Sequence, residues 1–98
     1  MSTSKKDLVS YRVQRAFGTL DDAKLLIENK KWNSAINRLY YSVFYAASAL
    51  ILLEDQAAFT HNGVKTSFSE KFVKTGKMDL SEGKLYSQLF FLETKGRL

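Results

Sequence analysis

Cysteine and proline are both absent from the 98 residues, and histidine and tryptophan occur once each. A chain without cysteine forms neither disulfides nor thiolate zinc sites, and its absence fits a reducing compartment. One histidine without a cysteine cannot build an ordinary transition-metal site, so no metal and no cofactor are predicted. The lack of proline fits helices joined by tight turns. The glycines form neither a GxGxxG nor a Walker sequence, so no phosphate-binding loop is expected.

Long hydrophobic runs are also missing. The longest apolar stretch, Val43 to Leu53, is interrupted by Ser48, and its eleven residues fall short of the roughly 20 that a membrane span needs. The polar N-terminus shows no signal peptide, so we expect a cytoplasmic protein with no membrane partner. The formal net charge is +5, but no run exceeds two basic residues. This scattered charge is either a solvated surface or a weak attraction for nucleic acid.

What the chain does have is apolar and aromatic content, with 45% hydrophobic and 13% aromatic residues. That composition is typical of an ordered globular chain. The length suits one hydrophobic core, so residues 1–98 are predicted to form a single domain.

Residues 33–53, NSAINRLYYSVFYAASALILL, carry apolar side chains on almost every side of a helical wheel. A helix of this kind must be buried by several neighbours. The exception is a polar stripe whose members are stepped by three or four residues, and it is our best candidate for a functional surface. The polar stripe consists of Arg38, Tyr41, Ser42, Tyr45 and Ser48, with Asn37 beside it.

An apolar seam predicts another helix before this central one, over about residues 6–28, with Ser4 at its cap. The short break at 29–31 makes these two helices antiparallel neighbours, with Asn33 as the expected N-cap of the second. Acidic residues at the end of the central helix, beginning with Glu54, oppose its dipole. They predict either fraying or a local compensating partner.

Two shorter helices are predicted after the central one. Thr60 is a plausible N-cap for the third helix, and Gly76 is suited to end it in a left-handed conformation. A seam of Leu85, Leu89 and Leu92 predicts a fourth helix. The predicted fold is therefore all-α, an antiparallel up-and-down bundle of four helices.

Three stretches in this order resemble the HEPN domain (the higher eukaryotes and prokaryotes nucleotide-binding domain) over roughly residues 7–92. They read DDAKLLIENKKWNSAINRLYYSVFYAASALILL, THNGVKTSFSEKFVKTGKMD and LYSQLF. The resemblance implies a helical bundle that is usually a homodimer and is commonly encoded beside a small nucleotidyltransferase. In such pairs the HEPN protein is often an RNA-cleaving toxin and the nucleotidyltransferase its antitoxin.

Active members of this family cleave RNA with an arginine that is followed, after four to six residues, by a histidine late in the chain. Such a pair can take the 2′-hydroxyl proton and steady the phosphorane charge. Here the only histidine is His61, residues 54–56 lie five to seven positions before it, and Arg97 has one residue after it. We therefore expect no catalytic residue in this chain. We also expect either a domain truncated or frameshifted near Phe91 or a short member with four helices.

The resemblance places the polar residues of the central helix near an RNA or nucleotide cleft. Arg38 is then expected to contact phosphate, with Asn37 as the hydrogen-bond partner that orients it. The alternative is a structural pair that bridges to Asp21, to Asp22 or to a neighbouring helix.

Aromatic residues are the other binding candidates. Tyr41 and Tyr45, together with Tyr40, could stack bases, or they could be core rings with hydroxyls at the edge. His61 joins the nucleotide or RNA candidates, and the alternative for it is a helix-start residue that hydrogen-bonds locally.

The leading hypothesis is a HEPN-family partner of a minimal nucleotidyltransferase that binds RNA or a nucleotide and performs no catalysis itself. A second is a metal-independent ribonuclease toxin whose Arg/His motif is missing from this chain. A third is a purely structural dimerisation module. All three include a homodimer among the expected assemblies.

Overall fold

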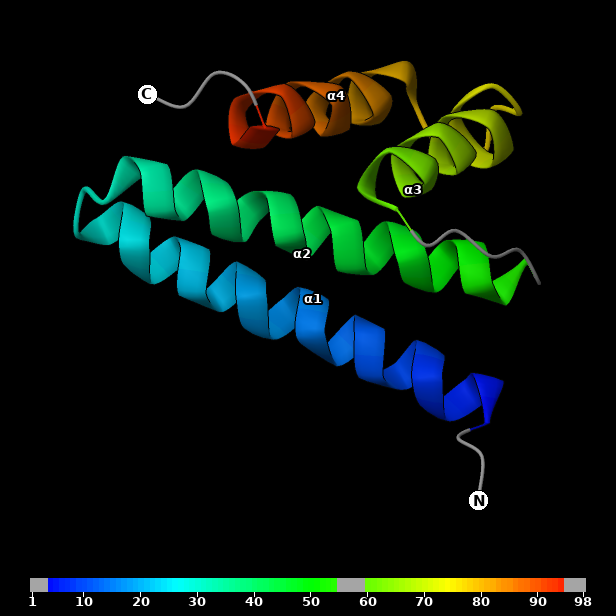
Figure 1. Cartoon of the computed structure of the whole chain (residues 1–98), viewed down its shortest axis with the longest axis horizontal. Coiled ribbons are helices and arrows are strands. Elements are labelled where there is room, and N and C mark those ends of the chain that lie inside the picture. Colours follow the sequence, from blue (N-terminus) through cyan, green and yellow to red (C-terminus); the bar gives the residue numbers. More distant parts are fainter. Residues whose placement is uncertain (1–3, 55–59, 95–98) are drawn as a thin grey trace.

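The computed structural model describes residues 4–54 and 60–94. Four α-helices follow one another: α1 (Lys5–Glu28), α2 (Trp32–Leu53), α3 (His61–Phe68) and α4 (Leu80–Thr94), with a π-helical turn, η1 (Ser69–Val73), directly after α3. The described residues contain no strand. The predicted all-α bundle is confirmed. Figure 1 shows α1 along one side of α2, with α3 and α4 on the opposite side.

The antiparallel pairing of α1 with α2 is the largest helix contact in the bundle, as the short break predicts. Ser4 accepts a hydrogen bond from the Asp7 amide and caps α1, also as predicted. Asn33 was the wrong N-cap for α2, because the helix begins one residue earlier, at Trp32, and Lys31 occupies the capping position without a side-chain bond. Lys30 takes a positive φ of 57° and makes the turn.

The core lies between α2 and the pair α3–α4. Tyr40 and Tyr86 are its largest fully buried side chains. A row of buried residues at four-residue steps runs from α3 into η1 and consists of Val64, Phe68 and Phe72. On α4 the prediction was partly wrong, because Leu89 is buried but Leu85 is 53% exposed. Tyr86, beside Leu85 in the chain, is the residue that points into the core instead.

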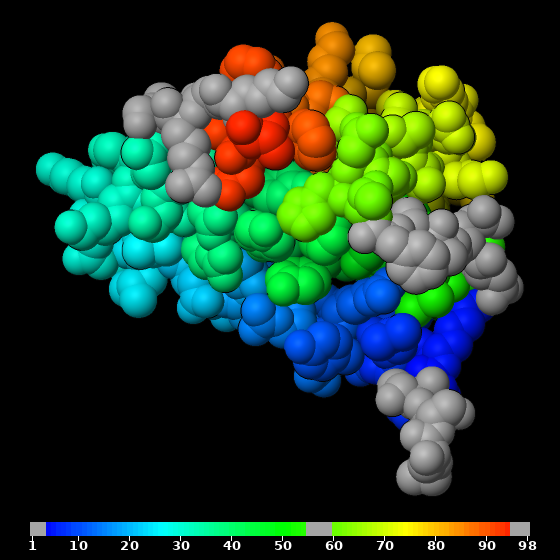
Figure 2. Space-filling model, viewed as in Figure 1, coloured from blue at the N-terminus to red at the C-terminus, as the bar shows by residue number. Residues whose placement is uncertain are grey.

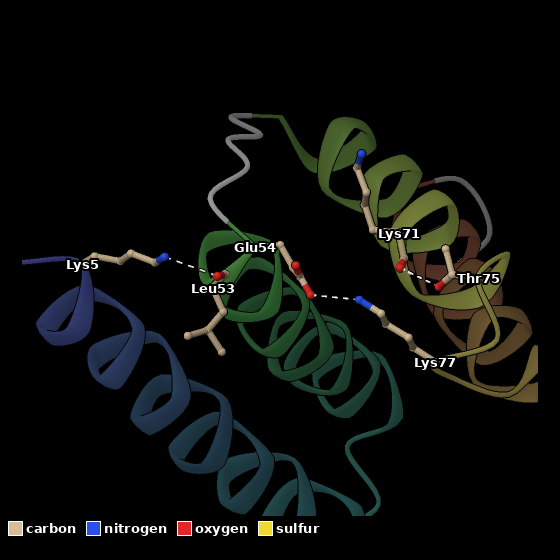
Figure 3. A network of polar contacts seen from close by, with 6 residues as sticks. All are labelled: Lys5, Leu53, Glu54, Lys71, Thr75 and Lys77. Carbon is tan, nitrogen blue, oxygen red and sulfur yellow. Dashed lines mark hydrogen bonds and ion pairs between the residues drawn. The ribbon is translucent and has the colours of Figure 1, made fainter.

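The acidic end of α2 has the compensating partner that its sequence calls for (Figure 3). The Glu54 carboxylate pairs with Nζ of Lys77 at 3.1 Å. On the other side, Nζ of Lys5 lies 3.3 Å from the carbonyl oxygen of Leu53 and donates a hydrogen bond to it. Two lysines from distant parts of the chain thus bring positive charge to the C-terminus of α2, where the helix dipole favours it.

The third helix is shorter than predicted, because its last turns change to the π-helix η1. Thr60 caps α3 by accepting a hydrogen bond from the Gly63 amide at 2.9 Å, as predicted. Gly76 has a φ of +79° and ends the segment in the left-handed region, also as predicted. Gly83 is a point of close packing between α4 and η1, because a Cβ there would lie 3.0 Å from a methyl group of Val73. Only glycine allows α4 to approach η1 this closely.

Within residues 4–54 and 60–94, one helix meets the length and composition of a membrane span. It is α2, with a mean hydropathy of 1.3 over its most apolar 18 residues. The apolar run 43–53 is shorter than this window, to which apolar residues nearer the start of α2, among them Ile36 and Leu39, also contribute. The core helix of a soluble protein meets the same criteria, and α2 packs against α1, α3 and α4.

Candidate functional site

Arg38 is held by a relay that crosses from α2 to α4. The side-chain oxygen of Asn37 accepts hydrogen bonds from Nε, at 2.8 Å, and from Nη2 of Arg38. The amide nitrogen of Asn37 in turn donates to the Glu93 carboxylate at 2.7 Å. Asn37 therefore orients the guanidinium, as the sequence predicts. The structural alternative is also met in part, because the Asn37–Arg38 pair bridges to Glu93 on the neighbouring helix α4, whereas Asp21 and Asp22 make no hydrogen bond to Arg38 within the described residues.

The Arg38 guanidinium also lies over an aromatic ring, with its central carbon 5.3 Å from the centre of the Tyr41 ring. Arg15 repeats this arrangement from α1, with its central carbon 5.2 Å from the centre of the Tyr45 ring. The two tyrosine rings are neighbours, with centres 6.2 Å apart. The result is a row in which two neighbouring phenol rings, Tyr41 and Tyr45, are flanked by the guanidinium groups of Arg38 and Arg15.

Arg12 extends this row by one helical turn, since its Nη1 lies 3.3 Å from the carbonyl oxygen of Ser48 and donates a hydrogen bond to it. Arg15 donates a longer hydrogen bond, of 3.5 Å, to the Tyr45 hydroxyl. That contact raises the pKa of Arg15 further above its ordinary value, so this guanidinium is charged at every physiological pH. We call the row the arginine–tyrosine face; it consists of Arg12, Arg15, Arg38, Tyr41 and Tyr45.

His61, the first residue of α3, borders this face. Its ring lies 5.6 Å from Tyr41, edge to face, and 4.5 Å from Phe44. Its Nδ1 is hydrogen-bonded to the Tyr40 hydroxyl at 2.9 Å. The expectation of a local bond at the helix start was therefore wrong, because the partner is 21 residues away in the chain. His61 is itself exposed, and the bond to Tyr40 fixes the orientation of its ring.

Tyr40 is the inner support of this arrangement and is fully buried. Burial is the main reason why the pKa of Tyr40 is raised to about 12, with smaller contributions from Tyr41 and Glu93. The hydroxyl is therefore protonated at neutral pH. For Tyr40 the core interpretation is confirmed, whereas Tyr41 and Tyr45 are only half-buried at the surface.

Ser42 was wrongly included in the polar stripe. It faces α1, where its hydroxyl donates to the carbonyl oxygen of Ala16 at 2.8 Å. The reason is helical phase, because Ser42 lies about 100° around α2 from Tyr41. Tyr41, Tyr45 and Ser48 remain on one side.

The scattered positive charge of the sequence does not reveal that Arg12 and Arg15 join the polar stripe. The signal that could have found them is the register of the helical hairpin. Arg15 and Tyr45 are each 15 positions from residue 30, the centre of the turn, and Arg12 and Ser48 are each 18 positions from it. In an antiparallel pair, residues equally far from the turn lie side by side.

The opposite side of the α1–α2 boundary is an apolar groove of about 400 Å³. Its walls include Phe17 and Leu53, which are 66% and 55% exposed. The apolar groove is lined by Val13, Ala16, Phe17, Leu20, Ser42, Ala46, Ala49, Leu50 and Leu53. No charged side chain is among them, so this surface favours apolar contact.

The arginine–tyrosine face can bind anions. The guanidinium groups are oriented by neutral or backbone acceptors, with the Glu93 carboxylate behind Asn37, and guanidinium forks match phosphate geometry. Beside Arg38 there is also a cavity of about 390 Å³, lined by Leu26, Ser34, Asn37 and Arg38. Among residues 4–54 and 60–94, no group of three acidic or histidine side chains is placed to hold a metal ion.

The chain is similar to proteins from Thermotoga maritima and Methanocaldococcus jannaschii. A Thermotoga maritima protein with the name "UPF0332 protein" is 44% identical over 88% of this chain and 65% of its own length. A Methanocaldococcus jannaschii protein with the name "Putative toxin MJ0605" is 32% identical over 85% of this chain and 62% of its own length. The chain thus spans less than two thirds of these curated relatives.

No solved structure matches the chain. The family model of the HEPN domain matches residues 9–95, which is most of the sequence. The helical bundle agrees with that match. The chain therefore belongs to the HEPN domain family.

Proposed function

We propose that this HEPN-family chain binds RNA through the sugar–phosphate backbone, at the arginine–tyrosine face, and does not cleave it. The observation that supports the proposal is the row of three guanidinium groups from two helices, each oriented by a hydrogen bond within the protein. Preorganised cations of this kind lose little side-chain entropy when they bind phosphate.

The length of the row favours a polynucleotide over a single nucleotide. Arg12 and Arg38 stand beside α2 positions about ten residues apart, which corresponds to about 15 Å along the helix. One nucleotide cannot reach both ends, whereas a few nucleotides of a strand can. His61 and the tyrosine edges then contact sugars or bases next to the bound phosphates.

The test is fluorescence anisotropy with a labelled 12-nucleotide RNA at low salt. Arg38→Ala is expected to weaken binding about five- to tenfold, because it removes a charged contact, and to leave the melting temperature unchanged. Lys24→Ala is the matched control, since Lys24 is exposed and lies nine residues from Arg15, on the opposite side of α1. Unchanged affinity with a lowered melting temperature would show that Arg38 is structural.

The absence of catalysis is a separate part of the proposal, because a relative carries a toxin name and active HEPN proteins need the Arg/His motif. Incubation of the chain with RNA in EDTA tests it. We expect intact RNA. Cleavage that EDTA does not inhibit and that RNA-free controls do not explain would favour the ribonuclease toxin.

A specific observation favours a second role, the association of two copies through the apolar groove. Exposed apolar surface with Phe17 at its centre is typical of interfaces, and a two-fold axis would bury the same patch on both copies. Sedimentation velocity tests this homodimer, and a monodisperse monomer at high micromolar concentration would contradict it.

The nucleotidyltransferase partner is supported by the family alone, and co-purification with a homologous nucleotidyltransferase tests it.

A further inference from the structure

A second concave surface lies away from the arginine–tyrosine face, between α3–η1 and α4. It is a cleft of about 360 Å³, within the range of about 300 to 1,000 Å³ that is usual for small-molecule sites. We call it the lysine cleft, and its polar rim is formed by Lys65, Ser69, Lys84, Ser87 and Gln88. We propose that the lysine cleft binds a small organic anion with an apolar body.

The floor of the cleft is apolar and firmly packed. Phe68 is 7% exposed, and Val73 lines the cleft next to it. Gly83 on the facing helix leaves no room for a side chain, because a Cβ would meet Val73 at 3.0 Å. The two walls are therefore fixed relative to each other, and a ligand body would find a preformed apolar surface.

The rim carries positive charge from two different elements. Lys65 comes from α3 and Lys84 from α4, and no acidic side chain is among the residues that line the cleft. Nζ of Lys65 lies 5.2 Å from the centre of the Phe90 ring, which restrains its position. Two lysines at the rim of an apolar floor suit a ligand that carries an anionic group on a hydrophobic body.

Two features of the wall set this cleft apart from an ordinary surface groove. One wall begins at Ser69, in the π-helical turn η1, and π-helical turns occur frequently at functional sites. The other includes Tyr86, whose hydroxyl is buried and has no hydrogen-bond partner among the described residues.

The anion is a carboxylate or a phosphate, and three probes with related bodies separate the sources: 3-phenylpropionate, phenyl phosphate and the uncharged 3-phenyl-1-propanol. Titration of the ¹⁵N-labelled chain is expected to shift amide signals of residues 65–69 and 83–88. At least one anion should bind about fivefold or more tightly than the alcohol. The better of the two anions identifies the preferred group. Equal affinity for all three probes, or shifts elsewhere, would overturn the proposal.

Variants locate the charge requirement. Lys84→Met keeps the apolar stem, removes the charge, and should weaken binding of the anion at least threefold. Lys74→Met is the matched control, because Lys74 is exposed in the turn after η1 and does not line the cleft. Ser87→Phe, at an exposed lining position, should fill the cleft and abolish binding. Equal effects of Lys84→Met and Lys74→Met would contradict the assignment.

The RNA experiment provides an independent check, since the two sites lie on different elements. The anionic probe at saturating concentration should leave RNA affinity unchanged, and Lys84→Met should do the same. If instead RNA displaced the probe and Lys84→Met weakened RNA binding as strongly as Arg38→Ala, the cleft would be an extension of the RNA surface. That result would overturn a separate small-molecule site without affecting the RNA proposal.

Discussion

The two sides of the α1–α2 boundary are built from the same pair of helices but have opposite chemistry. On one side, Arg15 and Arg38 lie over tyrosine rings and are oriented by hydrogen bonds. On the other, the apolar groove contains no charged residue, and Phe17 is 66% exposed there. Figure 2 shows α2, in green, reaching the surface between α1 and α3–α4.

This difference follows from how α2 is covered. Within residues 4–54 and 60–94, packed helices flank it on two sides, α1 on one and α3–α4 on the other. Two strips of its surface therefore stay open, about half a turn apart. A polar strip exposes little that needs covering, whereas an apolar strip costs free energy in water until a partner covers it. The comparison teaches that one helix can present a polar strip and an apolar strip, which suit contacts of different chemistry.

The largest expected effect comes from removing the charge of the polar side. The double substitution Arg15→Ala/Arg38→Ala should weaken binding of a 12-nucleotide RNA about 30-fold or more at low salt, because two phosphate contacts disappear. Anisotropy titrations at several salt concentrations measure it.

The matched control is Lys6→Ala/Lys24→Ala, since both lysines lie nine residues from Arg15, on the opposite side of α1. It should change affinity less than threefold. Equal losses in the two double variants would mean that only net charge matters, and the comparison between the two sides would no longer hold.

A substitution on the apolar side should weaken self-association and change RNA affinity little. Phe17→Asp places a charge in the apolar groove and should weaken self-association about tenfold or more, with RNA affinity per chain changed little. Sedimentation velocity over a concentration series measures it. Leu25→Asp is the control, because Leu25 is 59% exposed on the same helix and does not line the groove. A concentration-independent monomer in the unsubstituted chain would refute the interface.

Much of the fold could be predicted because short-range chemistry determines it. Ser4 and Thr60 cap their helices as expected, and Gly76 takes the left-handed conformation that a helix end needs. The errors arose where tertiary packing decides. Leu85 belongs to an apolar seam in the sequence, yet Tyr86 occupies the core, because the aromatic cluster around Tyr40 draws that side of α4 inward.

The candidate site could be predicted only in part, again because tertiary packing determines some of its contacts. Asn37, Arg38, Tyr41 and Tyr45 share one helix, so helical spacing alone groups them. Arg15 joins them only through the register of the hairpin, and the bond from His61 to Tyr40 joins α3 to α2, a contact that no local pattern encodes. Contacts between elements far apart in the chain need the fold before they can be recognised.

The polar side, unlike the apolar side, rests on the buried residue Tyr40. The effect of Tyr40 on the free energy of unfolding should be measurable at alkaline pH. Burial raises the pKa of Tyr40 to about 12, whereas an unfolded tyrosine ionises near pH 10. The unfolded state therefore loses its proton first, so the free energy of unfolding falls as pH rises from about 10 to about 12. In Tyr40→Phe the loss between pH 7 and pH 11 should be smaller by about 1 kcal/mol.

Denaturant titrations at the two pH values measure that difference, and Tyr11→Phe is the control because Tyr11 is 57% exposed on α1. An identical pH dependence in Tyr40→Phe and the unsubstituted chain would show that Tyr40 ionises without penalty in the folded state. In that case the ionisation of Tyr40 would not explain any loss of the hydrogen bond between Tyr40 and His61 at high pH.

The smallest predicted effect separates orientation from contact on the polar side. Asn37→Ala removes the acceptor that holds Arg38 but leaves its charge, so RNA affinity should fall only about threefold, through the entropy of a freed side chain. The dependence of affinity on salt should be unchanged, because the number of neutralised phosphates is the same, whereas Arg38→Ala should reduce that slope by about 1. The control is Asn29→Ala. Asn29 is exposed at the end of α1, and its side-chain amide donates a hydrogen bond to the carbonyl oxygen of Leu25 and not to Arg38. Asn37→Ala could instead reduce the salt dependence of RNA affinity as much as Arg38→Ala does. That result would show that Arg38 binds phosphate only when Asn37 orients it.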